Sequence, residues 1–97
     1  MMINENTIIG ATEDQVACDM KGELLILHTA SGTYYGLDPV GTRVWSLLQE
    51  PKRVGAIRDI LLDEYDVDRE RCTRNLIELV EKLTSKKLVE VKSAPLA

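Results

Sequence analysis

Few side chains in this 97-residue sequence could act as a nucleophile or a base. The single histidine, His28, ends the most apolar segment, and Cys72 has arginines nearby. A nucleophile needs a base within hydrogen-bonding reach, and that base is usually histidine. His28 sits where a strand is expected to end, a position typical of a histidine satisfied by local hydrogen bonds. A thiolate at Cys72 is the alternative to packing, but Cys72 falls on the apolar stripe of a helix. We therefore expect a protein that is not an enzyme.

Metal and phosphate chemistry have no support either. The sequence holds no His/Cys cluster with ligand spacing, no Asp-rich calcium loop and no glycine-rich phosphate loop. Its carboxylates are spaced as on helix surfaces, and nothing pairs two of them in an apolar pocket, as acid/base catalysis requires. We expect no metal and no cofactor.

The composition is that of one small soluble domain, with 44% apolar and 29% charged residues. Twelve Lys and Arg against sixteen Asp and Glu give a net charge of −4, which argues against nucleic acid or an anionic membrane as partner. No apolar run approaches the ~20 residues that cross a bilayer, and no signal peptide is readable. Cys18 and Cys72 are interpreted as small, buried, reduced residues of a cytoplasmic protein.

Strand patterns precede helix patterns, which indicates an α+β fold. Residues 15–20, 23–29 and 33–37 are expected to form a three-stranded antiparallel meander, with short strands also expected near 7–9 and 88–91. Segment 23–29 is apolar on both faces, as in a central strand covered on two sides. Three helices should follow, in an arrangement that looks like a winged helix-turn-helix: from Pro39 to about Pro51, 54–65 and 69–86.

The strand 33–37 is expected at a sheet edge, and it carries neither the charge nor the proline that normally protects such an edge. Its alternation points Tyr35 and Leu37 inward, with Tyr34 and Gly36 on the other face. An extended peptide can pair with such a strand and place apolar side chains in a groove beside the third helix. The alternative is that both tyrosines are ordinary amphipathic sheet residues.

The stretch from Val16 to Leu48 resembles the PqqD-like proteins, and most of all the stand-alone leader-binding proteins of lasso-peptide gene clusters. The resemblance is carried by Gly32–Asp38 (GTYYGLD), Gly41 and Val44–Leu48 (VWSLL), and segments 57–67 and 76–88 follow the second and third helices. It implies a recognition element for ribosomally synthesised peptides. Such an element captures the leader of a precursor and presents it to a transglutaminase-like leader peptidase acting with a cyclase.

The resemblance also implies where the leader binds. Its backbone would pair with the third strand, and its side chains would lie against the third helix, where Ile77 lies off the core stripe and is expected to need a partner from outside the core. Arg71 and Arg74 would steer an acidic leader. The peptide-binding residues expected on this basis are Thr33, Tyr34, Tyr35, Gly36, Leu37, Arg71, Thr73, Arg74, Leu76, Ile77, Val80 and Thr84.

The expected domain is 1–92, with 93–97 as a flexible tail, and the expected state is a monomer or a weak edge-strand dimer. Two features depart from the family pattern: the second helix lacks a Ser or Thr cap, and the tail after Val91 has no counterpart. Two alternatives stay open, a PqqD-like peptide carrier for a radical-SAM enzyme and a winged-helix DNA-binding regulator. Against the regulator, Glu70, Glu78 and Glu81 interleave with the cations of the third helix.

Overall fold

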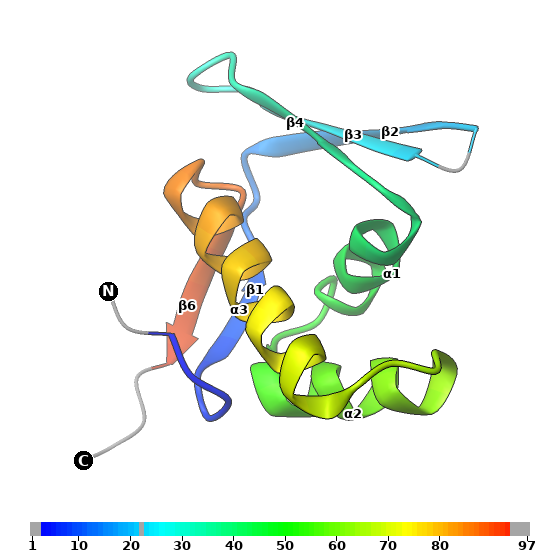
Figure 1. The fold of residues 1–97 in the computed structure, drawn as a ribbon. Helices are drawn as coiled ribbons and strands as arrows, with labels where there is room; N and C mark the ends of the chain where they lie inside the picture. The colour runs from blue at the N-terminus through cyan, green and yellow to red at the C-terminus, as the bar shows by residue number, and fades with distance from the viewer. Residues whose placement is uncertain (1–2, 22, 94–97) are drawn as a thin grey trace.

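A computed structural model describes residues 3–21 and 23–93 of the chain (Figure 1). The α+β class, the meander and the three helices are confirmed. None of the described helices is long and apolar enough to cross a membrane. The elements in chain order are β1 (Ile8–Ala11), β2 (Gln15–Met20), β3 (Glu23–His28), β4 (Tyr34–Leu37), α1 (Pro39–Leu47), β5 (Lys52–Arg53), α2 (Val54–Glu64), α3 (Arg69–Ser85) and β6 (Val89–Ser93).

The first sheet, here called the meander sheet, has the antiparallel order β2-β3-β4. One row across it aligns Cys18, Leu25 and Gly36. The loop between β3 and β4 contains Gly32, whose φ of +72° is a left-handed conformation that glycine adopts without a steric penalty. In the β2–β3 turn, Lys21 itself has a φ of 56°, and Gly22 lies outside the described residues.

The second sheet, here called the terminal sheet, has the antiparallel order β5-β1-β6 and pairs the first described strand with the last. The strands expected near 7–9 and 88–91 are present as β1 and β6, and they pair with each other. The two-residue strand β5 was not predicted. Ser93, expected in the tail, is the last residue of β6, and 94–97 lie outside the described residues.

The core lies between the two sheets and the helices. Helices α1–α3 and the terminal sheet all lie on one side of the meander sheet in Figure 1. The meander sheet contributes its inner face, with Ile26 completely buried and Leu37 nearly so. The helices contribute the residues of their apolar stripes, among them Val44, Trp45, Leu48, Ile57, Leu61, Leu76, Val80 and Leu83.

The N-termini of α1 and α2 differ in whether the neighbouring sequence supplies the cap of the helix. Asp38 Oδ1 accepts a hydrogen bond from the Gly41 amide at 2.7 Å, so α1 begins as expected. No side chain caps α2. Its first amides, of Val54 and Gly55, instead donate to the carbonyls of Thr7 and Glu5, at 3.0 and 2.9 Å. The cap missing from the local sequence is therefore supplied by the N-terminal segment.

Two expectations about the meander sheet were wrong. Strand β3 is covered on its inner face only, since Leu27 on the other face is 40% exposed. Cys18, expected to be buried, is exposed on that same face. Apolar side chains in a strand do not by themselves show that both faces are covered.

Gly32 gives a test of the hairpin geometry. Gly32→Ala should lower the free energy of unfolding by about 1 kcal/mol, because alanine resists positive φ. Gly36→Ala is the matched control: a Cβ there meets nothing within 4 Å, and the change should stay within about 0.5 kcal/mol. Urea denaturation of the three proteins measures both. Equal losses in the two variants would contradict the assigned loop.

Candidate functional site

Strand β4 has one edge paired with β3 and one edge free. The His28 amide donates to the Thr33 carbonyl at 2.8 Å, which fixes the hydrogen-bonded phase of the ladder. By alternation, Tyr35 and Leu37 also bond toward β3, while the main-chain groups of Tyr34 and Gly36 point to the free edge. Within residues 3–21 and 23–93, no strand pairs with that edge. It therefore offers two N–H and two C=O groups to an incoming chain.

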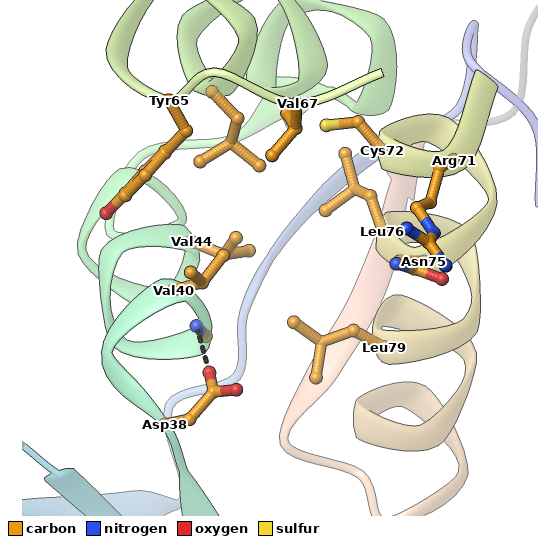
Figure 2. Close-up of a pocket in the computed structure, with 12 residues that line it drawn as sticks. Asp38, Val40, Val44, Tyr65, Val67, Arg71, Cys72, Asn75, Leu76 and Leu79 are labelled. Carbon is orange, nitrogen blue, oxygen red and sulfur yellow. Dashed lines mark hydrogen bonds between the residues drawn. The ribbon is translucent and has the colours of Figure 1, made fainter. Parts of the chain in front are cut away.

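A cavity of about 370 Å³, here called the α1–α3 groove, opens where β4 passes into α1 (Figure 2). Val40 and Val44 on α1 face Leu76 and Leu79 on α3 across it, with Asp38 at one end. Carbon atoms dominate the lining, so the groove suits apolar side chains. It is lined by Asp38, Val40, Gly41, Val44, Leu61, Tyr65, Val67, Arg71, Cys72, Asn75, Leu76 and Leu79.

Helical spacing places the walls of the groove. Residues three and four apart share one face of a helix, which aligns Val40 with Val44 and Cys72 with Leu76 and Leu79. At the base of the α1 wall, a Cβ on Gly41 would lie 3.1 Å from Leu37 Cδ2. Glycine at this position therefore lets the first turn of α1 pack closely against the end of β4.

The α1 wall is tied to the end of α2 by a two-pronged ion pair. Arg43 Nε and Nη2 donate to Glu64 Oε1 and Oε2, at 2.8 and 2.6 Å. The hydrogen bond from Arg43 is the main cause that lowers the pKa of Glu64. Since Glu64 directly precedes the groove residue Tyr65, this pair holds α1 and the α2–α3 connector together along one side of the groove.

On the opposite wall, Cys72 is half-buried. Burial raises the pKa of its thiol, and the positive charge of Arg58 opposes this only in part. A thiol whose pKa is raised stays protonated near neutral pH, so Cys72 serves as an apolar wall residue. The alternative role as a thiolate nucleophile gains no support from this environment.

At the start of β4, the strand contacts the other end of α3. The Tyr35 side chain is half-buried on the inner face, and Lys86 Nζ lies 5.8 Å from the centre of its ring. This cation–π contact joins β4 to the C-terminal end of α3. The contact shows that the inner face of β4 is turned toward this end of α3.

The sequence-predicted strand residues lie as expected. Tyr34 is 66% exposed on the outer side, Tyr35 is half-buried and Leu37 is buried on the inner side. Thr33 precedes the strand and closes the hairpin through its carbonyl.

The predicted α3 residues divide among different surfaces. Arg71 and Leu76 line the α1–α3 groove. Val80 is completely buried, so its predicted place at the peptide surface was wrong. The others line two separate depressions: Thr73, Arg74 and Ile77 the first, and Thr84 the second.

Ile77 is only half-buried: it packs against the core cluster and lines the depression that also contains Glu5 and Arg58. That it needs a partner from outside the core stays a prediction. Arg58 is buried and ion-paired with Glu5, so the N-terminal segment borders this depression.

The groove residues that the sequence prediction missed come from three elements. Leu79 was assigned to the core stripe, yet it is only half-buried and lines the groove. Val40 and Val67 are 44% and 48% exposed. These two exposed valines, one at the start of α1 and the other after α2, were the available signal for a groove. The sequence could not show that they lie close together, because this depends on how the helices pack.

The surroundings of α3 do not resemble a nucleic-acid interface. Arg69 and Arg74 share their depression with Glu70, Glu78 and Glu81. Phosphate binding needs cations unopposed by carboxylates. Nor does any group of three or more His, Cys, Asp or Glu among residues 3–21 and 23–93 form a metal site.

Comparisons with solved structures report two similar chains. The structure described as "TbiB1 in Complex with the TbiA(beta) Leader Peptide" is 39% identical, with a TM-score of 0.78, covering 88% of this chain and 99% of that one. "Lasso peptide synthetase B1 complexed with the leader peptide" is 18% identical, with a TM-score of 0.74, covering 84% and 96%. At that identity the second likeness shows the fold alone.

No protein with a curated description matches this chain. The family model for coenzyme PQQ synthesis protein D (PqqD) matches residues 23–89, from the start of β3 to the start of β6. That range contains the free edge of β4, both walls of the α1–α3 groove and all three helices. Since it spans well over half of the sequence, this chain belongs to the PqqD family.

Proposed function

We propose that this chain binds the leader segment of a ribosomally synthesised precursor, that of a lasso peptide, and presents it to a leader peptidase acting with a cyclase. The leader adds as a strand to the free edge of β4 and places apolar side chains in the α1–α3 groove. The observation that carries the proposal is the unpaired edge of β4, a strand whose end leads at Asp38 directly into that groove.

The free energy of binding requires both parts of the site, the edge of β4 and the α1–α3 groove. The free edge offers four main-chain groups, on Tyr34 and Gly36, each worth about 1 kcal/mol net when hydrogen-bonded. That total does not offset the entropy lost on ordering and docking a flexible peptide. Two or three buried apolar side chains, at about 1.5–3 kcal/mol each, supply the remainder. The edge thus sets register and direction, and the groove supplies most of the affinity.

The comparisons support this assignment. The 39% identical relative aligns over 88% of this chain and 99% of its own, and its structure is described as a complex with a leader peptide. The proposed mode of action is binding without catalysis. His28 is buried with Nδ1 2.8 Å from Ser31 Oγ, and the Cys72 thiol has a raised pKa, so neither side chain is poised as a base or a nucleophile.

The groove wall is tested by an aspartate at Leu79. Leu79→Asp should weaken binding of a synthetic leader roughly tenfold to a hundredfold, the loss expected when one buried apolar contact of about 1.5–3 kcal/mol is removed. Isothermal titration calorimetry measures the dissociation constant. Ile77→Asp is the matched control, because Ile77 is also half-buried on α3 but lines the other depression.

The control variant should bind the leader as the unmodified protein does, provided that thermal denaturation shows it folded. A larger loss in Ile77→Asp than in Leu79→Asp would place the leader on the opposite flank of α3. Unchanged binding in both variants would remove the helix from the site.

Strand addition is tested on the peptide itself. A leader methylated at one backbone nitrogen at a time loses one N–H donor and gains bulk at that position. Because alternate residues of a strand point their main-chain groups toward the same neighbour, sensitivity to methylation should recur every second residue along the segment opposite Tyr34 and Gly36. Titration of each methylated peptide measures the pattern. Helical spacing of the sensitive positions, at three and four residues, would exclude strand addition.

Cysteine alkylation reports on groove occupancy. Leader at about ten times its dissociation constant should slow the reaction of Cys72 with iodoacetamide roughly tenfold, because the occupied groove covers the thiol. Cys18, on the far face of the meander sheet, is the internal control and should react at an unchanged rate. Mass spectrometry of timed samples measures both rates. Protection of Cys18 instead of Cys72 would place the leader on the wrong face for this proposal.

A further inference from the structure

The meander sheet has a second surface that the leader site does not use. Its outer face carries Val16, Cys18 and Met20 from β2, Leu25 and Leu27 from β3, and Tyr34 and Gly36 from β4. Of these, Val16, Met20 and Tyr34 are each more than half exposed. Every described helix and the terminal sheet lie on the opposite side (Figure 1).

The chemistry of this face is that of an interface. A sheet with one face in water normally alternates apolar and polar residues, with polar side chains outward. Here the outward side chains are apolar over three neighbouring strands, and the one charge among them is Glu23, opposite Met20 at the end of the sheet. Contiguous exposed apolar side chains of this kind mark protein–protein contact sites.

We propose that the outer face is the docking surface for the folded leader peptidase that receives the bound leader. The peptidase contributes an apolar patch with a cation placed against Glu23. This inference rests on the proposed function, since it assigns where the receiving enzyme binds.

Continuity with the leader site favours the peptidase as occupant. Tyr34 and Gly36 belong both to the free edge and to the outer face. A leader strand paired with that edge extends the sheet, and every second leader side chain then points outward beside them. A protein docked on the outer face therefore contacts this chain and the leader at once.

The size of the face argues against a second copy of this chain. Strands of six, six and four residues, with about 3.3 Å per residue and about 4.8 Å between strands, give a projected area of roughly 250 Å². A stable interface buries about 800 Å² per partner. Although projected area and buried accessible surface are not the same quantity, the gap indicates that the outer face alone falls short of what a stable symmetric dimer buries. A peptidase that also grips the leader gains the missing area, so its binding should depend on the leader.

The test separates docking from leader binding. Val16 lies on β2, the strand farthest from the leader edge, so Val16→Lys should leave the leader dissociation constant unchanged. The same variant should weaken binding of the leader-loaded protein to the purified peptidase of the same biosynthetic cluster roughly tenfold or more. Biolayer interferometry with immobilised peptidase measures this. Ala17→Lys, an exposed neighbour on the opposite face, is the matched control and should bind as the unmodified protein.

Val16→Thr guards against loss of the fold, because threonine keeps the branched shape and the strand preference while a hydroxyl replaces one methyl group. It should weaken docking less than Val16→Lys. The proposal would be overturned if the folded Val16→Lys variant bound the peptidase as tightly as the unmodified protein does. It would also be overturned if Val16→Lys and Ala17→Lys lost equal peptidase affinity. A dimer in sedimentation velocity that Val16→Lys dissociates would also overturn it and assign the face to a second copy. If the unmodified protein did not bind the leader at all, the proposed function would be refuted instead.

Discussion

The structure depends on strand β4, whose main-chain groups are hydrogen-bonded to a neighbouring strand along one edge only. In folded proteins, nearly all buried main-chain N–H and C=O groups are hydrogen-bonded. An uncharged free strand edge is normally avoided, because other chains can pair with it. In β4 the edge opposite β3 lacks a strand partner within residues 3–21 and 23–93. The strand is held in place from its other sides, by β3, by α1 starting directly after it, and by Lys86 over Tyr35. An edge that is held in place but unpaired is a ready template for an extended peptide.

The terminal sheet engages the first and the last of the described strands. In it β1 pairs with β5 and with β6. The N-terminal segment is used further, because its Thr7 and Glu5 carbonyls cap α2 and Glu5 pairs with Arg58. Each of these contacts consumes main-chain or charged groups that lie far from β4. Residues 5–11 and 89–93 are thus committed to contacts other than with the edge of β4.

What the sequence could and could not predict follows the range of the interactions. Asp38 caps α1 three residues away, so a local pattern sufficed. The cap of α2 comes from Glu5 and Thr7, and no inspection of residues near Val54 could find it. The sequence could not show which flank of α3 lines the groove, for a related reason. Helical periodicity separates Ile77 from Leu79, but which flank faces α1 is decided by tertiary packing. Similarly, apolar residues on both sides of β3 left open whether its outer face is covered by this chain or by another.

A single sheet can serve two partners because its edge and its face use different groups. The edge binds through main-chain N–H and C=O groups, which are nearly independent of sequence, whereas the face binds through side chains. Residues of an added strand alternate between the two sides. Leader residues that turn inward would meet the α1–α3 groove and determine affinity, while those that turn outward would lie beside Tyr34 and Gly36. Under the proposed function, capture and handover would therefore be encoded at alternate positions of the same peptide, and each could change in evolution without disturbing the other.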